Sequence, residues 1–325
     1  MIRMDEIVLF FIPALALLYD MLIGERPLYL HPVMAYGKVI SLFDKHFGEG
    51  HSKNISRLYG LALLSVLGLL SALPVLALGL IFKNYGTDPI VYVLTMIMSI
   101  YLLKTSFSMR HMVHEAREVC RYVKDRDIDG ARHRVSYIVS RNTENLGFED
   151  ILSADVECVS ESFVDSIFSP MFYFLLFGLY GCQFYRAMNS ADSRVGYMTE
   201  RYRDFGLIPA RFDDLLNFIP ARLAVIVTLV SGMLLRQDVR GGWRTYRKYA
   251  NATQSPNAGQ TMATYSGLLR VRLHKPGHYD IGNEFESPRP QDVEKAIDIY
   301  VLSTFISIVL VILAFMTPLL PMIFI

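Results

Sequence analysis

The sequence contains little charge and few cysteines. Only 19% of its 325 residues are charged, against 52% hydrophobic, and the mean hydropathy is +0.31. These values argue strongly against an ordinary soluble domain, which carries about 25% charged residues. Basic residues number 32 and acidic residues 31, so the chain lacks the basic excess of a nucleic-acid-binding protein. Cys120, Cys158 and Cys182 show no CxxC spacing, and therefore indicate neither a disulfide framework nor a zinc site.

Long apolar runs account for the high hydropathy. They lie at 7–23, 60–82, 89–104, 166–185, 215–235 and 299–325. The runs at 60–82 and 299–325 contain no charged residue and are long enough to cross a bilayer as helices. The first run carries a single charge, Asp20, and has about the minimum length for a spanning helix. The third run ends at Lys104, whose long side chain can snorkel toward the membrane surface.

Two of these runs contain residues that interrupt helices. Pro170, Gly178 and Gly181 lie within the run at 166–185, and Pro220 and Arg222 lie near the start of the run at 215–235. Broken helices at membrane depth usually line a cavity, so either segment could be re-entrant rather than spanning. The sequence therefore predicts an all-α, polytopic integral membrane protein that forms one domain over residues 1–325. It should have about four spanning helices and two broken or re-entrant segments.

The basic residues indicate how the chain is oriented in the membrane. All of them except Arg3, Lys83 and Arg222 lie in four of the connections between the runs, with Lys104 counted as the start of one, whereas the short turn at 83–88 holds Lys83 alone. Lys and Arg in such connections mark the cytoplasmic side. We therefore expect a multi-pass protein of the cell membrane with both termini outside. The segments expected to face the cytoplasm are 24–59, 105–162, 183–214 and 236–298.

Clusters of polar residues beside the apolar runs are the best candidates for a functional site, because such placement is costly. One cluster surrounds His31, although from spacing alone a helix-ending turn with a hydrogen-bonded histidine explains that cluster better. A second cluster places Glu157, Glu161 and Asp165 at i, i+4 and i+8, on one face of a helix, shortly after Arg141. These carboxylates would bind magnesium through oxygen atoms, or would form a solvated helix face.

Two further clusters follow along the chain. Asp213 and Asn217 are four residues apart, and Arg222 lies inside an apolar run. Arginine can bind phosphate there and aspartate can bind a metal ion, although a surface loop with ion pairs is the alternative. The segment SPNAG at Ser255 resembles an anion-binding loop in outline, without the pattern of a P-loop. Walker, Rossmann and zinc-protease signatures are absent, so spacing alone names no reaction.

Taken together, the motifs resemble those of the adenosylcobinamide-phosphate synthase family. They are HPV at His31, SRNT at Ser140, ExxxExxxD at Glu157, YRAMNSADSRVGY at Tyr185, ARFDDLLNFIPARL at Ala210 and SPNAG at Ser255. The resemblance implies a multi-pass membrane ligase of cobalamin biosynthesis. It implies ATP-dependent amide formation between adenosylcobyric acid and (R)-1-aminopropan-2-ol or its O-phosphate, which gives adenosylcobinamide or its phosphate. The partners are then ATP, magnesium, a corrinoid, an amine donor and the bilayer, with no nucleic acid.

The clusters and the resemblance together suggest roles for individual residues. Catalytic roles are expected for Glu157, Glu161, Arg211, Asp213 and Asp214, and magnesium ligands are expected at Glu157, Glu161, Asp165 and Asp213. Substrate contacts are expected from His31, Arg141, Arg186, Asn189, Asp192, Asn217, Arg222, Ser255 and Asn257. The preferred amine donor and the oligomeric state, including a homo-oligomer, stay open. A membrane transporter or sensor is the alternative function, although the uncharged runs at 60–82 and 299–325 favour an enzyme.

Overall fold

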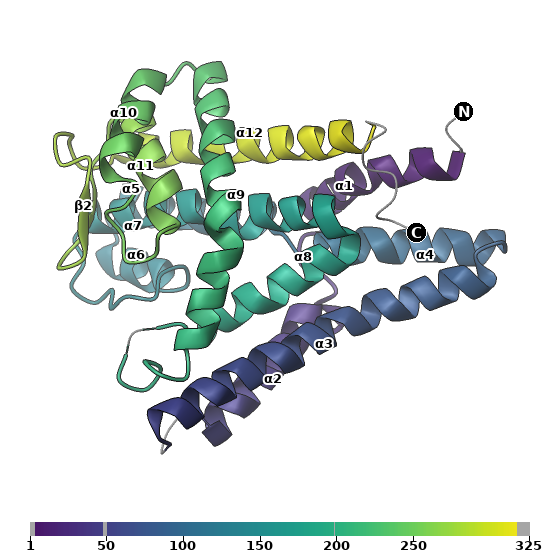
Figure 1. Ribbon diagram of the computed structural model, residues 1–325. Helices are drawn as coiled ribbons and strands as arrows, with labels where there is room; N and C mark the ends of the chain where they lie inside the picture. Colours follow the sequence, from purple (N-terminus) through teal and green to yellow (C-terminus); the bar gives the residue numbers. More distant parts are fainter. Residues whose placement is uncertain (1–3, 48–50, 198, 317–325) are drawn as a thin grey trace. The chain divides into compact units, whose positions relative to one another are not determined.

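The computed structural model describes residues 4–47, 51–197 and 199–316, and most of these residues are helical (Figure 1). Along the first half of the chain, the helices are α1 (Met4–Leu22), η1 (Leu28–Leu30), α2 (Pro32–Phe47), α3 (Lys53–Tyr85), α4 (Pro89–Lys104), α5 (Met109–Lys124) and α6 (Ile128–Val135). The second half contains α7 (Phe148–Phe163), η2 (Val164–Phe168), α8 (Ser169–Val195), α9 (Leu207–Leu234), α10 (Val239–Tyr249), α11 (Ala258–Leu269) and α12 (Pro290–Phe315). Two short strands, β1 (Leu273–Lys275) and β2 (Tyr279–Ile281), pair antiparallel between α11 and α12.

Several helices are long and apolar enough to cross a membrane. Among the described residues there are five such helical stretches: Lys53–Tyr85, Pro89–Lys124, Phe148–Val195, Leu207–Leu234 and Pro290–Phe315. In α1, Phe11–Leu22 forms a shorter apolar helix. The prediction of an all-α, polytopic membrane protein is therefore confirmed. Of the last predicted run, residues 317–325 lie outside the described residues.

Local sequence explains where α4 begins and where α8 is interrupted. The Asp88 carboxylate accepts hydrogen bonds from the backbone N–H groups of Ile90 and Val91 at 2.8 and 3.2 Å, and Pro89 occupies the first helical position. In α8, Gly178 adopts φ 61°, a left-handed conformation that other residues rarely adopt, and the helix is broken there. The predicted interruption of the run at 166–185 is thus located at Gly178.

The structure corrects the expected break in the run at 215–235. α9 is one helix through Pro220. A proline has no N–H group, so the carbonyl four residues earlier loses its usual helical partner. That carbonyl belongs to Leu216, and the Tyr173 hydroxyl donates a hydrogen bond to it at 2.9 Å. A side chain of α8 therefore replaces the missing backbone bond, which the sequence of α9 alone does not reveal.

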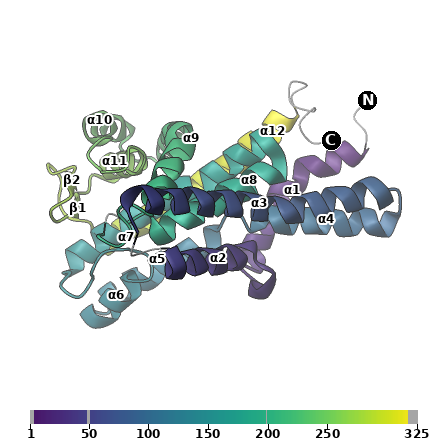
Figure 2. The same cartoon turned by 60° about the horizontal axis from the view of Figure 1, so that its bottom comes forward.

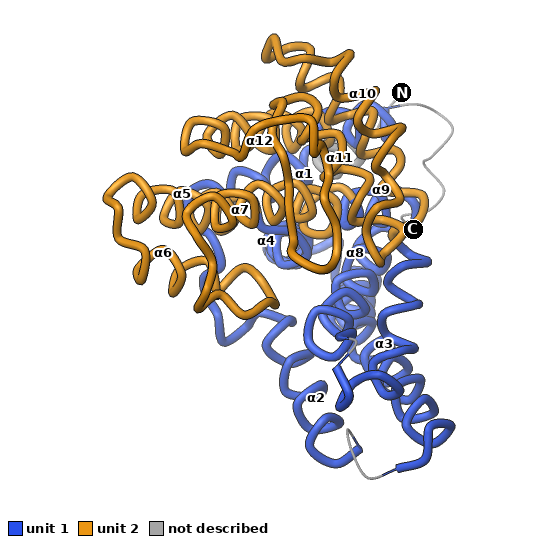
Figure 3. The backbone as a smooth tube through the Cα atoms, turned by 90° about the vertical axis from the view of Figure 1, so that its left-hand side faces the viewer, with its two compact units in different colours: residues 1–108, 169–216, 308–325 blue, residues 109–168, 217–307 orange. Residues whose placement is uncertain are grey.

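The described chain divides into two compact units, which no shift in composition predicted (Figure 3). Unit 1 comprises residues 1–108, 169–216 and 308–325, as far as they are described. Its core is apolar and joins α2, α3 and α8 with the segment before α9. The core residues are Tyr36, Ile40, Leu63, Leu64, Leu67, Ala187, Met188, Ala191, Val195 and Phe205.

Unit 2 comprises residues 109–168 and 217–307. In it, α7 packs against α5, α6 and α11, and α10 lies along α11. α10 and α11 approach closely at Gly241 and Gly267, where a β-carbon on Gly267 would collide with the Gly241 backbone. The β1–β2 hairpin contacts α7 and α11, and Figure 2 shows it beside the α10–α11 pair. This arrangement gathers segments that are far apart in the sequence around the C-terminal half of α7.

Candidate functional site

A small pocket of about 220 Å³ lies in unit 2, beside α7. Its walls come from the loop before α7, the helix itself, the loop before α11 and the β hairpin. The lining residues are Ile138, Val139, Ser140, Arg141, Glu157, Cys158, Glu161, Thr253, Gln254, Ser255, Ala258, Lys275, His278 and Tyr279. Four of the predicted site residues, Arg141, Glu157, Glu161 and Ser255, therefore meet in one place.

Glu157 is held by three hydrogen bonds and is buried. Its Oε2 atom accepts one from Arg141 Nη2 at 3.0 Å and one from the Tyr279 hydroxyl at 2.8 Å. Its Oε1 atom accepts one from the Ser153 hydroxyl at 2.6 Å. Ser153 also accepts the backbone N–H of His274 at 2.8 Å, which ties the hairpin to α7. The carboxylate of Glu157 thus organises the pocket wall.

Other charged groups of the pocket are much less bonded. Glu161 and Lys275 make no hydrogen bond or ion pair that the described part of the chain provides, yet they are close enough to interact electrostatically. Nε and Nη1 of Arg141 are buried and have no hydrogen-bond partner in the described structure. Buried donors without a partner are costly and are typical of a site that binds an acceptor. The pocket therefore offers two cations and one carboxylate to a ligand.

The electrostatics of the pocket keep Tyr279 protonated. Burial raises the pKa of the Tyr279 phenol, and the negative charges of Glu157 and Glu161 raise it further. Because the pKa is raised above its ordinary value of 10.0, the hydroxyl remains a hydrogen-bond donor at neutral pH. Tyr279 therefore acts as a fixed donor to Glu157 and not as a base.

The turn that contains Ser255 borders the pocket and leads into α11. The Thr253 hydroxyl donates to the Ser255 carbonyl at 2.7 Å and accepts the N–H of Gly259 at 3.0 Å. Asn257 is buried, and its Oδ1 atom accepts a hydrogen bond from Arg222 Nη1 at 3.2 Å. Arg222 also donates to the Phe218 carbonyl at 2.6 Å. The predicted pair Arg222 and Asn257 thus joins α9 to the turn.

A second group of predicted residues lies in unit 1, where α8 ends and α9 begins. Asn189 Nδ2 donates to Asp213 Oδ1 at 3.2 Å, and Arg186 Nη1 donates to Asn189 Oδ1 at 3.4 Å. The negative charges of Asp213 and Asp214 act on Asp192. We call Arg186, Asn189, Asp192, Asp213 and Asp214 the acidic group. Arg186 Nε is buried without a hydrogen-bond partner in the part of the chain that the structure describes.

The remaining predicted residues are not gathered by either group. Arg211 is exposed, and the described residues give it no hydrogen bond or ion pair. Asn217 is buried, and Asp165 is half-buried in the π-helical turn η2. Residues 4–47, 51–197 and 199–316 contain no group of three or more His, Cys, Asp or Glu side chains that could hold a metal ion. Of the predicted magnesium ligands, Glu157, Glu161 and Asp165 belong to unit 2 and Asp213 belongs to unit 1.

His31 belongs to a separate cluster of unit 1. The sequence indicated polar residues around His31 but not that Lys104, from the end of α4, joins them. The buried Lys104 ammonium lies 2.9 Å from Asp20 Oδ1 and 2.7 Å from Glu25 Oε1, so Lys104 does not snorkel as expected. His31 Nε2 lies 3.0 Å from Glu25 Oε2, and His31 Nδ1 accepts the N–H of Val33 at 3.4 Å. We call Asp20, Glu25, His31 and Lys104 the Lys104 cluster. Both ring nitrogen atoms of His31 therefore already have hydrogen-bond partners, Glu25 and the backbone of Val33.

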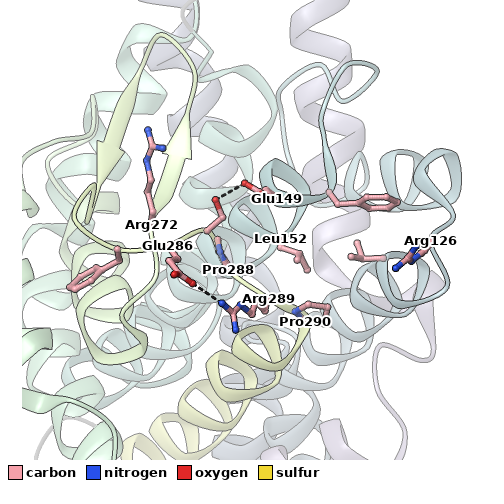
Figure 4. A pocket seen from close by; sticks show the side chains of 12 residues that line it. Arg126, Glu149, Leu152, Arg272, Glu286, Pro288, Arg289 and Pro290 are labelled. Carbon is pink, nitrogen blue, oxygen red and sulfur yellow. Dashed lines mark hydrogen bonds and ion pairs between the residues drawn. The ribbon is translucent and has the colours of Figure 1, made fainter.

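A larger cavity of about 820 Å³ also lies in unit 2, on the side of α7 near its first turn (Figure 4). Its polar side chains largely pair with one another: Ser287 donates to Glu149 at 2.7 Å, and Arg289 donates to Glu286 at 2.6 Å. Arg272 forms two 2.7 Å hydrogen bonds with Asp280. None of the residues predicted for the site lines this cavity.

Sequence reasoning missed Lys275 and His278 in the small pocket and Lys104 in unit 1. The segment HKPGHYD at 274–280 carried a signal, because a Pro-Gly turn between basic residues is typical of a hairpin that presents them together. Nothing in the sequence brings that hairpin to Glu157, which lies more than a hundred residues earlier.

Comparisons with known proteins support a single family. The family model described as CobD/Cbib protein matches residues 13–308. A probable cobalamin biosynthesis protein CobD of Methanothermobacter thermautotrophicus is 38% identical over 290 residues, which cover 89% of this chain and 91% of that protein. The cobalamin biosynthesis protein CobD of Dehalococcoides mccartyi is 39% identical over 288 residues, covering 89% and 91% of the two chains. No solved structure matches the chain.

Proposed function

The chain belongs to the CobD/CbiB family of cobalamin biosynthesis, and we propose that it is an ATP-dependent acid–amine ligase. It would join adenosylcobyric acid to (R)-1-aminopropan-2-ol or its O-phosphate and so form adenosylcobinamide or its phosphate. The observation that carries this proposal is the small pocket of unit 2. Unsatisfied cationic donors and an unbonded carboxylate lie together there, and such a ligation needs both anion binding and a proton acceptor.

The reaction requires the corrinoid carboxylate to be activated. In the proposed sequence that carboxylate attacks the terminal phosphorus of ATP, ADP leaves, and an acyl phosphate forms. The amine then attacks the acyl carbon, the C–N bond forms, and phosphate leaves with the electrons of the C–O bond. Developing charge on phosphate oxygens is best stabilised by fixed donors such as guanidinium groups. Arg186 of unit 1 has a buried Nε donor, without a partner in the described structure, that suits this task.

The acidic group of unit 1 suits magnesium bound together with a nucleotide. Protein carboxylates usually bind this ion through one or two side chains plus substrate phosphates, without a complete protein cage. Asp192 lies beside Asp213 and Asp214, and the repulsion among these carboxylates would be relieved by a cation. Bound magnesium would neutralise phosphate charge, while Asn189 holds Asp213 in place.

We further propose that the protein resides in the cell membrane with its site loops toward the cytoplasm, where ATP is present. The distribution of Lys and Arg supports this orientation. Single cysteines placed in the 183–214 segment would be labelled by a membrane-impermeant reagent only from the cytoplasmic side of sealed vesicles. Labelling from the outer side would contradict the orientation.

One assay tests the ligase proposal directly. Purified protein in detergent is incubated with ATP, magnesium, adenosylcobyric acid and each amine in turn, and the corrinoid products and ADP are separated by chromatography. We expect an amide product and one ADP for each amide formed. Absence of corrinoid amide with every amine would reject the ligase and favour the alternative of a transporter or sensor, for which the helix break at Gly178 is the supporting feature.

A further inference from the structure

Arg141 uses one nitrogen atom of its guanidinium group within the described structure. Nη2 donates to Glu157 at 3.0 Å, while Nε and Nη1 are buried and unpartnered there. A guanidinium group has five N–H donors in a fixed plane. Nε and Nη1 lie on different edges of that plane, so each can donate a hydrogen bond to an oxygen atom of a carboxylate or a phosphate.

Lys275 supplies a second cation on the same side of the pocket. In the hairpin, Lys275 pairs directly with Tyr279, and side chains of directly paired residues lie on the same face of an antiparallel ladder. The Tyr279 hydroxyl reaches Glu157, so this face of the hairpin is turned toward the pocket. Lys275 lines the pocket and acts electrostatically on Glu161. Its ammonium has no hydrogen bond or ion pair with any residue that the structure describes.

The size of the pocket limits what it can bind. At about 220 Å³ it holds roughly seven groups the size of a water molecule, at ~30 Å³ each. It is smaller than the sites of drug-sized ligands, which start near ~300 Å³. A nucleotide or a corrin ring is too large to be enclosed, whereas a short amino alcohol with or without a phosphate is small enough.

The charges of the pocket match a small zwitterion. Arg141 and Lys275 suit an anionic end, and the carboxylate of Glu161 suits an ammonium end. An uncharged hydroxyl could accept hydrogen bonds from only some of the N–H donors of Arg141 and Lys275, and would leave buried donors unsatisfied. We propose that Lys275 is a specificity-determining residue, which together with Arg141 holds the anionic end of a phosphorylated amine donor while Glu161 faces its ammonium. This inference rests on the proposed ligase function for the identity of the ligand as an amine donor.

Glu161 can then prepare the amine for reaction. The ammonium gives one proton to the Glu161 carboxylate, and the nitrogen lone pair attacks the acyl carbon of the activated corrinoid. The C–N bond forms, the C–O bond breaks, and the departing phosphate takes the bonding electrons. The second proton leaves the nitrogen to that phosphate, so the products are the amide, hydrogen phosphate and a protonated Glu161. Lys275 takes no part in these transfers and fixes the position of the donor.

The kinetic test compares the two amines in Lys275→Met, with Lys275→Arg and Lys248→Met as controls. Lys248 is exposed on α10 and pairs with Glu284 at 3.5 Å, away from the pocket lining. Loss of one charge-assisted hydrogen bond should raise KM for the phosphorylated amine about tenfold to a hundredfold in Lys275→Met. KM for the free amino alcohol and kcat should stay within about twofold. Lys275→Arg keeps the positive charge and should recover most of the loss, and Lys248→Met should resemble the wild type. Equal changes for both amines, or no change for either, would overturn the proposal.

A binding test separates this inference from the proposed function. Purified protein without ATP or corrinoid is titrated with 2-aminoethyl phosphate, ethanolamine or inorganic phosphate, and the thermal midpoint is followed. We expect 2-aminoethyl phosphate to raise the midpoint most, and Lys275→Met to lose most of that rise. Binding with this pattern in a protein that makes no amide would retain the pocket assignment and reject the ligase. Amide synthesis without this dependence on Lys275 would retain the ligase and reject the role of Lys275.

Discussion

Two buried charge clusters, one in each unit, differ in whether their polar groups already have partners. In the Lys104 cluster of unit 1, the ammonium lies within ion-pair distance of two carboxylates, and His31 bonds one of them. In the small pocket of unit 2, Glu157 is bonded just as completely, but Arg141 keeps two buried donors without partners in the described structure. A closed network has little left for a ligand. The comparison therefore separates charges that join helices from charges that we propose to bind substrate.

The position of His31 shows why this distinction matters. Its place in the HPV segment made it a candidate for substrate binding, yet its two ring nitrogens bond Glu25 and the backbone of Val33. A turn between α1 and α2 is thereby fixed to the end of α4 through Glu25 and Lys104. The geometry supports a structural role for His31, and its role in binding stays an untested prediction.

The largest effect that sharpens the comparison is expected from Glu161→Gln. If the small pocket of unit 2 is catalytic, removal of the Glu161 carboxylate as proton acceptor should reduce kcat by about a hundredfold or more, since general base catalysis typically contributes that much. The thermal midpoint should change little, because Glu161 makes no hydrogen bond among the described residues. Glu200→Gln, at an exposed position of unit 1, is the matched control. Near-normal amide synthesis by Glu161→Gln would leave this carboxylate as part of a solvated face.

Asp213→Asn tests whether the acidic group of unit 1 binds a ligand, as we propose for the small pocket of unit 2, or is only structural, like the Lys104 cluster. Magnesium with ATP should raise the thermal midpoint of the wild type, because binding to the folded state adds stability by mass action. Asp213→Asn should lose most of that rise and at least about tenfold of the turnover, since it removes one candidate carboxylate ligand. Asp129, which is 90% exposed in its ion pair with Arg132, provides the control Asp129→Asn. An unchanged magnesium-dependent rise in Asp213→Asn would place the ion elsewhere.

Lys104→Met should affect folding and not substrate binding. Removing one partner of a buried ion pair leaves carboxylates uncompensated and typically costs about 3 kcal/mol. Lys104 and Asp20 are 1% and 0% exposed, so little solvent is available to replace the ammonium. The thermal midpoint in detergent should fall clearly, while KM for both amines stays as in the wild type. A raised KM with an unchanged thermal midpoint would contradict the distinction between the Lys104 cluster, as a structural network, and the small pocket of unit 2, as a binding site.

Tyr279→Phe should have a smaller effect within the pocket wall. The substitution removes one hydrogen bond to Glu157 but leaves those from Arg141 and Ser153. The expected loss of stability is about 1 kcal/mol, with KM raised a few-fold because Arg141 and Lys275 are held less firmly. Tyr246→Phe on α10 serves as the control, since Tyr246 is not among the pocket residues. A loss of kcat as large as that of Glu161→Gln would instead give the phenol a direct part in the reaction.

The smallest effect concerns acid stability of the Lys104 cluster. Burial raises the pKa of Glu25. The hydrogen bond from His31, the charge of Lys104, and the hydrogen bonds from Lys104 and Ser108 lower it more, so the pKa lies below its ordinary value of 4.5. A carboxyl with a lowered pKa in the folded state stabilises the fold above its unfolded pKa, and this contribution is lost as pH falls below about 4.5. The thermal midpoint of the wild type should therefore decline on acidification from pH 5 toward pH 3. Glu25→Gln should start lower and decline less, and a parallel decline would contradict the assignment.

Much of the helical framework was predictable because long apolar runs have few alternatives in a bilayer. The runs at 60–82 and 89–104 correspond to α3 and α4, which extend or match the expected limits. The interruption at Gly178 follows from the freedom of glycine to adopt a positive φ. Continuity of α9 through Pro220 did not follow, because it depends on the Tyr173 hydroxyl of another helix.

The amino-acid sequence by itself determined the apolar helices, an interruption within the run at 166–185, the family and the i, i+4 spacing of Glu157 and Glu161. Each of these depends on composition or on local spacing along one helix. Tertiary structure alone decided that Lys275 lines the same pocket as Glu161 and that Lys104 is buried against Asp20. Both arrangements join residues from distant parts of the chain, and the Lys104–Asp20 pair forms because buried charges need partners from whichever helices the packing brings together.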